Sequence, residues 1–158
     1  MAELSEDQIR DVNAEVLEHM MNPKNYGSIE DASAVGVGLD PATGEYAVIY
    51  LNIDEKENID DIKFGCQACQ DTVIAGSLFT QMVKGATLDY AIEASKRLAL
   101  KIQDAPPKQQ ACSGMIIKGF EAAILHKQSR EKGEDVDMVT LELGTSCEGV
   151  ENKENQEG

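Results

Sequence analysis

The chain has no tryptophan, and its aromatic content is only 4% of 158 residues. Basic residues are also scarce, because 14 lysines and arginines stand against 29 acidic residues, which leaves a formal net charge of -15 at pH 7. Binding to nucleic acid or to an anionic membrane surface depends on basic side chains. The composition therefore argues against both kinds of partner. Most acidic residues are expected to form a solvated surface, which could also attract basic partners or cations.

Long hydrophobic runs are missing too. The longest uncharged apolar-rich run, residues 72–83, is shorter than the roughly 20 residues that span a bilayer. Residues 1–10 are polar and acidic, so we expect no signal peptide. Four cysteines in a chain of this size do not resemble the dense framework of small secreted proteins. We therefore expect a cytoplasmic, reducing location, where clustered cysteines more often bind metals or carry out thiol chemistry.

The chain has only two histidines, and both fall in helical patterns. His19 stands at the end of a predicted helix, where a histidine favourably caps the helix dipole. His126 lies well inside another predicted helix and is a poor ligand candidate. No Ser–His–acid arrangement, no Cys–His arrangement and no phosphate-cradling glycine loop stands out. We therefore predict that the protein is not an enzyme.

Alternating apolar residues predict the strands of a small sheet. Residues 45–53 alternate between two faces, and residues 59–64 form the return strand after a turn. Residues 35–38 form a short glycine-bearing strand before them. The simplest arrangement of these strands is an antiparallel meander.

Apolar residues at helical spacing predict the helices. Ser5 and Gln8 form a capping box that opens the first helix. Its apolar face consists of Ile9, Val12, Val16 and Met20. A second helix follows residue 72 and ends at Gly85. A third helix is capped by Thr87 and ends before the two prolines at 106–107. Cys112 opens a long last helix.

The length suits one domain, and no internal repeat is visible. Residues 138–143 form a further short strand. We predict an α+β fold in which one domain, residues 1–143, packs a small antiparallel three-stranded sheet against several helices. Residues 144–158 are predicted to form a disordered acidic C-terminal tail.

Two cysteines three residues apart mark the chemistry of the chain. Cys66 lies in the loop after the strand 59–64, and Cys69 lies close to a helix N-terminus, where free N–H groups favour a thiolate. Cys112 is expected to stand in the same way at the start of the last helix. Two helix N-termini can meet at one edge of a small sheet, so Cys69 and Cys112 can converge. Such soft ligands typically bind zinc, iron or an iron–sulfur cluster.

Zinc takes four ligands from cysteine, histidine, aspartate and glutamate. The candidate ligands in this chain are Cys66, Cys69, Cys112, Cys147, Glu45 and Asp71. Cys147 could equally be an exposed free thiol, and Glu45 could equally be a surface residue at the start of a strand.

Several segments, in their order and spacing, resemble the IscU/NifU-type iron–sulfur cluster scaffolds. The matching segments are residues 22–27 (NPKNYG), 40–45 (DPATGE), 83–89 (VKGATLD), 106–112 (PPKQQAC) and 121–124 (EAAI). The resemblance runs from about Val16 to Lys127. It implies a SufE/NifU-like fold, a small antiparallel sheet packed on helices, which agrees with the patterns above.

The resemblance implies transient assembly of an iron–sulfur cluster, with [2Fe–2S] as the expected type. Three cysteines bind the cluster in this family, with an aspartate and a histidine nearby, and Cys69 and Cys112 match two of those cysteines. A cysteine desulfurase is implied as the sulfur donor, and recipient proteins or chaperones as acceptors. Residues 105–109 (APPKQ) differ from the family's chaperone-recognition segment, which argues against the chaperone contact.

The chain departs from the family pattern at the ligands themselves. Thr43 replaces the first ligand cysteine, Glu45 replaces the neighbouring aspartate, and Ala111 replaces the histidine. Cys66 is an addition. Since the loops of Thr43 and Cys66 should lie at one end of the sheet, Cys66 could supply the missing thiolate, with Glu45 or Cys147 as the fourth ligand.

Three functions remain open. The first is a scaffold or carrier that holds an iron–sulfur cluster with a rearranged ligand set. The second is a zinc-binding relative with a structural or regulatory role, because Cys66, Cys69, Cys112 and either Cys147 or Glu45 would suit zinc equally well. The third is a thiol protein that relays sulfur or redox equivalents through Cys66 and Cys69, although the βαβ context of thioredoxin-like proteins is missing. Two chains could also share one cluster as a homodimer.

Overall fold

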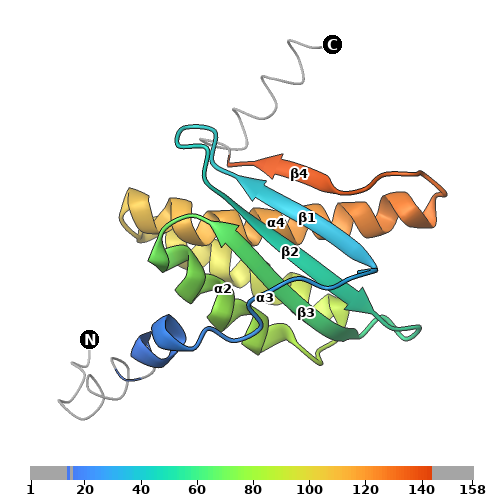
Figure 1. Cartoon of the computed structure of the whole chain (residues 1–158), viewed down its shortest axis with the longest axis horizontal. Helices are drawn as coiled ribbons and strands as arrows, with labels where there is room; N and C mark the ends of the chain where they lie inside the picture. The colour runs from blue at the N-terminus through green and yellow to red at the C-terminus, as the bar shows by residue number, and fades with distance from the viewer. Residues whose placement is uncertain (1–13, 15, 144–158) are drawn as a thin grey trace.

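In the computed structural model, which describes residue 14 and residues 16–143, helices cover one face of a four-stranded sheet (Figure 1). The strands are β1 (Ala34–Leu39), β2 (Tyr46–Ile53), β3 (Ile59–Gln67) and β4 (Val139–Glu142), in the order β3-β2-β1-β4. β1, β2 and β3 form the predicted antiparallel meander. The predicted α+β class is confirmed.

The sheet has four strands, and the prediction of three is wrong in this detail. The strand expected near residues 138–143 is β4, which pairs with β1 in parallel and places Thr140 opposite Val37. A parallel neighbour must be reached by a long crossover. Helix α4 (Pro107–Glu131) makes that crossover behind the sheet (Figure 1). Local sequence indicates a strand there, but not the strand that it joins.

Helices α2 (Gln70–Val83) and α3 (Leu88–Lys101) lie where the pattern predicts them. Gly85 follows α2 with a φ of 82°, a left-handed conformation that glycine adopts without steric cost. The Thr87 side chain caps α3 by accepting a hydrogen bond from the backbone nitrogen of Tyr90. A short 3-10 turn, η1 (Ile102–Asp104), leads from α3 toward α4.

The prediction that Cys112 opens the last helix is wrong, because α4 begins at Pro107. Proline suits the first position of a helix, since its φ is already helical and the N–H that it lacks would have no partner there. Pro106 and Pro107 therefore separate two helical segments and also start the second one. Cys112 lies in the second turn of α4 and is buried.

Two glycines of β1 let α4 pack directly on that strand. A Cβ atom on Gly38 would lie 2.0 Å from the carbonyl oxygen of Met115, and one on Gly36 would meet the backbone of the same helix at 2.1 Å. In the core, the rings of Phe79 from α2 and Phe120 from α4 meet edge to face with their centroids 5.2 Å apart. These contacts fix the position of α4 on the sheet.

The segment that leads into β1 is bound to the outer edge of β3. The backbone nitrogen of Gly27 donates to the Phe64 carbonyl at 2.8 Å, and the nitrogen of Phe64 donates to the Asn25 carbonyl at 2.9 Å. In the helical residues 16–21, His19 is 3% exposed, and its Nδ1 lies 2.5 Å from the hydroxyl oxygen of Ser77 in α2. His19 therefore anchors this segment to α2, a role that its place near a helix end did not indicate.

His126 is buried in α4 and links that helix to the sheet. Its Nδ1 accepts a hydrogen bond from the backbone nitrogen of Val35 at 2.9 Å, and its Nε2 lies 2.5 Å from the carbonyl oxygen of Val136. The predicted capping box at Ser5, the predicted tail and Cys147 lie outside the described residues. Within the described residues, no helix combines the length and the apolar character needed to cross a membrane.

Candidate metal centre

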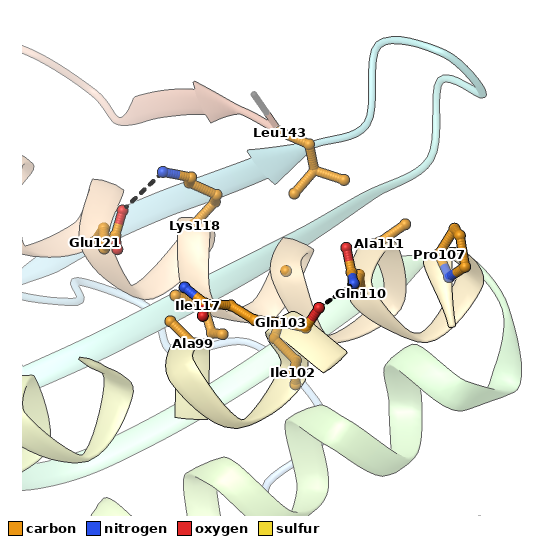
Figure 2. Close-up of a pocket in the computed structure, with 11 residues that line it drawn as sticks. Ala99, Ile102, Gln103, Pro107, Gln110, Ala111, Ile117, Lys118, Glu121 and Leu143 are labelled. Carbon is orange, nitrogen blue, oxygen red and sulfur yellow. Dashed lines mark hydrogen bonds and ion pairs between the residues drawn. The ribbon is translucent and has the colours of Figure 1, made fainter. Parts of the chain in front are cut away.

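A cavity of about 510 Å³ lies between the end of α3, η1, α4 and Leu143 (Figure 2). Its wall is mostly apolar, and the ion pair of Lys118 and Glu121, 3.2 Å apart, contributes polar groups. Ala111, where the resemblance implied a histidine, lines this cavity. Among the residues that the structure describes, neither a thiol nor a histidine lines this cavity, so they offer no soft metal ligand there.

Cys69 lies at the positive end of α2, in the turn that joins β3 to this helix. It is the N-cap residue, with φ -74° and ψ 168°, and its side chain makes no capping hydrogen bond. Thr72 Oγ1 lies 3.7 Å from Cys69 Sγ. The sulfur therefore remains available to a ligand at a place where the helix dipole favours negative charge.

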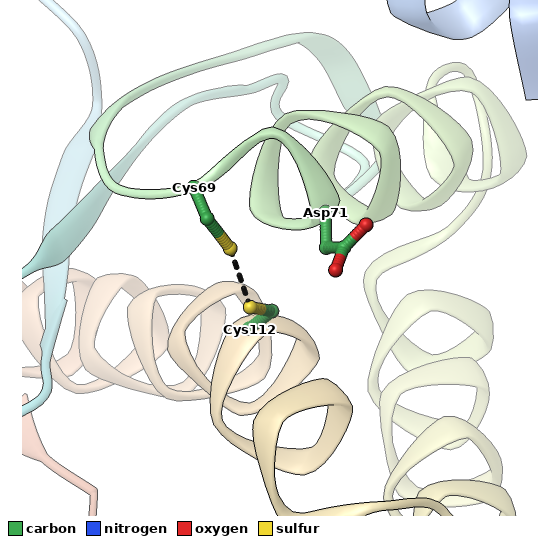
Figure 3. A group of neighbouring side chains, drawn as sticks. All are labelled: Cys69, Asp71 and Cys112. Carbon is green, nitrogen blue, oxygen red and sulfur yellow. Dashed lines mark hydrogen bonds between the residues drawn. The ribbon is translucent and has the colours of Figure 1, made fainter.

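Cys112 meets Cys69 from the second turn of α4, and we call these two residues the thiol pair. Their Sγ atoms are 2.6 Å apart, and Cys112 is 3% exposed. A carboxylate oxygen of Asp71 completes a group of three ligand atoms that all lie within 4.8 Å of one another (Figure 3). Two soft sulfurs and one carboxylate oxygen are suited to iron or zinc.

Hydrogen bonds make the two thiols unequal. Burial disfavours the Cys69 thiolate, but hydrogen bonding with the Cys112 thiol and the Thr72 hydroxyl, together with the nearby backbone N–H groups of Thr72 and Asp71, outweighs it, so the pKa of Cys69 is lowered. Burial, donation to Cys69 and the negative charge of Cys69 raise the pKa of Cys112 to about 11. In the metal-free protein Cys69 therefore loses its proton first, and Cys112 keeps its proton as the donor.

This inequality predicts the order of alkylation in the metal-free protein. Cys69 should react with iodoacetamide with a pH midpoint below the ordinary pKa of 9.0, and Cys112 only well above it. Cys112→Ala removes the donor and should raise the midpoint of Cys69. Mass spectrometry of each site across a pH series measures both, with Ser113→Ala as the control that leaves them unchanged. One common midpoint for the two thiols would contradict the prediction.

Cys66 lies on the sheet face that the helices cover. In β3 it follows the buried residues Ile62 and Phe64 at a spacing of two, so the three side chains share one face. Its partner in β2 is Ala47, which is also buried. Cys66 therefore points toward the layer that carries the thiol pair, although it is not part of the group formed with Asp71.

Burial, neighbouring negative charges and one hydrogen bond shift the pKa of Cys66. Burial raises the pKa of Cys66, and so do the negative charges of Cys69 and Glu45, whereas a hydrogen bond with Tyr26 lowers it. Its thiol is therefore less reactive than that of Cys69 in the metal-free protein. The same interactions place Cys66 within electrostatic range of two other predicted ligands.

Thr43 and Glu45 lie in the turn between β1 and β2. The Thr43 hydroxyl donates to Glu45 Oε1 at 3.1 Å and accepts from the backbone nitrogen of Glu45 at 3.1 Å. Tyr46 stands opposite Gln67, so this turn lies at the end of the sheet from which β3 leads to Cys69. The prediction that Cys66 lies in a loop is wrong, because β3 runs to Gln67 and includes Cys66. The predicted placement of Thr43 and Cys66 at one end of the sheet is confirmed. Glu45, like Cys66, is outside the group of three ligand atoms.

The sequence patterns did not indicate Thr72 or Tyr26 as neighbours of the cysteines. Thr72 is the third residue of α2, a position from which side chains reach back to the N-cap residue, so this signal could have identified it. Tyr26 contacts Phe64 edge to face, with ring centroids 5.2 Å apart, because residues 25–27 lie along β3. That contact joins distant segments and has no local signal.

Comparison with known proteins bears on this site and on the fold. A family model described as the NifU-like N terminal domain matches residues 11–134. The chain is 32% identical over 123 residues to the iron-sulfur cluster assembly scaffold protein IscU of Aquifex aeolicus, which covers 75% of this chain and 78% of that protein. It is 31% identical over 140 residues to the iron-sulfur cluster assembly scaffold protein IscU 1 of Archaeoglobus fulgidus, covering 88% of this chain and 90% of that one.

A solved structure supports the fold. The N-terminal part of a nitrogen-fixing NifU-like protein from Brucella abortus matches with a TM-score of 0.58 at 18% identity, covering 75% of this chain and 95% of that chain. At this identity the match bears on the fold alone, and it agrees with the sheet and helix layers described above.

Proposed function

Because the chain belongs to the NifU-like N terminal domain family, we propose that it is a scaffold or carrier that holds an iron–sulfur cluster through cysteine thiolates. The observation that carries this proposal is the thiol pair, whose sulfurs meet beside Asp71 at the start of α2. Cysteine thiolates are the usual ligands of such clusters. The relatives from Aquifex aeolicus and Archaeoglobus fulgidus, named as assembly scaffolds, support the same role.

We assign the third thiolate to Cys66. It lies on the helix-covered face of β3 and within electrostatic range of Cys69. The turn at the same end of the sheet carries Thr43, whose hydroxyl is a poor ligand for iron. Cys66 thus supplies from β3 the sulfur that this turn does not offer.

Three groups compete for the fourth position. Asp71 already lies beside the thiol pair, and Glu45 lies in the nearby turn. Cys147 is outside the described residues, but the backbone nitrogen of Leu143 donates to the Leu39 carbonyl at 2.7 Å, so the chain leaves the sheet beside the turn between β1 and β2. Four further residues span at most about 14 Å, which keeps Cys147 within reach of that end of the sheet.

Cys66→Ser should weaken cluster binding by about 10-fold or more. Changing a group that only orients a metal ligand already lowers metal affinity by at least about 10-fold, and Cys66 is proposed as a ligand itself. Adding Thr43→Cys to this variant should restore much of the binding, because the sulfur then comes from the neighbouring turn. The rate at which a chelator removes iron measures both effects. Thr43→Ser in the same background is the control and should restore nothing. If Cys66→Ser holds iron as the parent does, Cys66 is not a ligand.

Reconstitution with iron and sulfide without oxygen tests the function itself. We expect thiolate-to-iron charge-transfer absorption in the visible, with iron and sulfide eluting together with the protein. Elemental analysis of protein purified without oxygen gives the native content. A protein that keeps no sulfide and instead holds one zinc ion tightly would contradict the scaffold role and support a zinc-binding role, for which the same donors are suited.

The relay of sulfur or redox equivalents between Cys66 and Cys69 has less support. Cys69 has Cys112 as its sulfur neighbour at 2.6 Å, and the pKa of Cys66 is raised rather than lowered. A relay depends on an accessible thiol with a depressed pKa beside its partner. The contact between Cys69 and Cys112 therefore supports cluster binding better than a relay through Cys66 and Cys69.

A scaffold needs a sulfur donor and cluster acceptors. We propose a cysteine desulfurase as the donor and cluster-recipient proteins as the acceptors, as the family resemblance implies. Residues 105–109, at the junction of η1 and α4, depart from the family's chaperone segment, so we propose no chaperone contact. A cluster shared by two copies of the chain would supply further thiolates if one chain provides too few.

A further inference from the structure

A small surface cavity lies between α2 and α3. Its volume is about 160 Å³, and its lining residues are Met82, Tyr90, Ala94, Arg97, Leu98 and Lys101. None of these residues belongs to the group of three ligand atoms around the thiol pair. Binding pockets for small molecules usually measure about 300–1,000 Å³, so a cavity of this size fits a single side chain of a larger partner.

Apolar side chains around this cavity are exposed to solvent. Met82 is 46% and Tyr90 is 50% exposed. Leu78 lies one turn before Met82 on the same side of α2 and is 37% exposed, so the apolar surface continues along that helix. Contiguous apolar patches on a protein surface mark interaction sites more often than single exposed residues do.

The charge of this surface is opposite to that of the whole chain. Residues 94–103 (ASKRLALKIQ) contain three basic and no acidic residues, although the chain has 29 acidic residues and a net charge of -15. Arg97 and Lys101 are exposed, and neither forms an ion pair with another described residue. The helix dipole favours basic residues near the end of α3, but it does not account for the exposed apolar side chains beside them. The surface is therefore complementary to a partner that combines apolar and acidic groups.

An α-helix fits this surface better than an extended segment does. A helix satisfies its own backbone hydrogen bonds, whereas an added strand needs a free sheet edge, which two helices do not offer. Arg97 and Lys101 are four residues apart in α3, so they are separated by about 6 Å along the helix axis. Carboxylates four residues apart on a second helix have the same separation.

We propose that the surface formed by α2 and α3 binds an acidic amphipathic helix of a partner protein. An apolar side chain of that helix enters the cavity beside Met82 and Leu98, and two carboxylates on its flank pair with Arg97 and Lys101. Because the surface shares no residue with the thiol pair, the docking needs no bound cluster and does not depend on the proposed function.

A stapled helical peptide tests the charge complementarity on the full-length, metal-free protein. Its leucines stand at i, i+4 and i+7 with glutamates beside them, and a second version carries lysines in place of the glutamates. By fluorescence anisotropy, we expect the glutamate peptide to bind severalfold more tightly than the lysine peptide. Arg97→Glu combined with Lys101→Glu should reverse this preference. Lys56→Glu combined with Lys132→Glu changes two exposed lysines outside the cavity and should leave the preference as it is.

Two results of this experiment would overturn the proposal. One is a glutamate peptide that does not bind, and the other is a charge-reversed variant that keeps the preference of the parent. Dimers of the parent protein that dissociate in the Arg97→Glu and Lys101→Glu variant, with peptide binding only at low protein concentration, would also overturn it. A second copy of the chain would then occupy the surface.

Met82→Ser tests the apolar contact separately. It should weaken binding of the glutamate peptide severalfold, because it removes an apolar wall of the cavity. The melting temperature should stay the same, since the side chain is largely exposed. Leu125→Ser is the matched control, because Leu125 is 42% exposed on α4 and does not line the cavity. Equal binding by Met82→Ser and the parent would overturn the proposal.

Discussion

Cys69→Ser and Cys112→Ser are each expected to abolish cluster retention. Each substitution removes one of two sulfurs that lie 2.6 Å apart, and a serine hydroxyl is a poor ligand for metals that prefer thiolates. Changing a group that merely orients a ligand typically costs about 10–100-fold in metal affinity, so the loss of a ligand should cost more. Iron and sulfide per chain after anaerobic reconstitution and gel filtration measure the effect.

Stability separates the loss of a ligand from the loss of the fold. Cys69 is the N-cap of α2 without a capping hydrogen bond, and serine is among the best residues at this position. Cys69→Ser should therefore lose the cluster while the free energy of unfolding stays equal or rises by up to about 1 kcal/mol. Cys112 is 3% exposed, so Cys112→Ser buries a hydroxyl and should lower the free energy of unfolding by about 1 kcal/mol.

Ser113→Ala is the matched control for this pair of variants, because Ser113 follows Cys112 in α4 and is not part of the group of three ligand atoms. It should retain as much iron and sulfide as the parent. Full metal content in Cys69→Ser or Cys112→Ser would mean that the thiol pair is not the site. A loss in Ser113→Ala as well would mean that this turn of α4 is sensitive to any substitution.

Structural features that depend on neighbouring residues could be predicted from the sequence. The alternation in β2 predicted one shared face for Ala47, Ile49, Leu51 and Ile53. The first three are fully buried, and Ile53 is partly buried against the core. The ends of α2 and α3 follow from Gly85 and Thr87, because capping acts within a single helical turn. These signals need no knowledge of the distant chain.

Features that depend on contacts between distant segments could not be predicted in the same way. β4 joins β1 in parallel only after α4 has crossed the sheet. Cys112 was expected at a helix N-terminus, yet α4 begins at Pro107, and the sulfur reaches Cys69 from the second turn. The two sulfurs do lie in contact, as predicted. The prediction placed both cysteines at helix N-termini, and only Cys69 lies at one.

Gly38→Ala should lower the free energy of unfolding strongly, because the contact between β1 and α4 has no room for a methyl group at Gly38. A Cβ atom on Gly38 would lie 2.0 Å from the Met115 carbonyl oxygen and 2.7 Å from the Gly119 nitrogen. Both atoms belong to the backbone of α4, so no change of rotamer relieves the clash and the helix must move away from β1. Overpacking a core usually costs about 1–3 kcal/mol, and we expect a loss of about 3 kcal/mol or more by urea unfolding.

Gly65→Ala is the control for this substitution, because a Cβ atom there has no neighbour within 4 Å, and the free energy of unfolding should change by no more than about 0.5 kcal/mol. Gly38→Ala also tests how the thiol pair is held. α4 carries Cys112 and α2 follows Cys69, so moving α4 off β1 separates the two sulfurs and should lower cluster retention even in folded protein. Equal stability of Gly38→Ala and Gly65→Ala would show that α4 can shift on β1 without cost. A destabilised Gly38→Ala protein with full cluster content would show that other contacts hold Cys112 against Cys69.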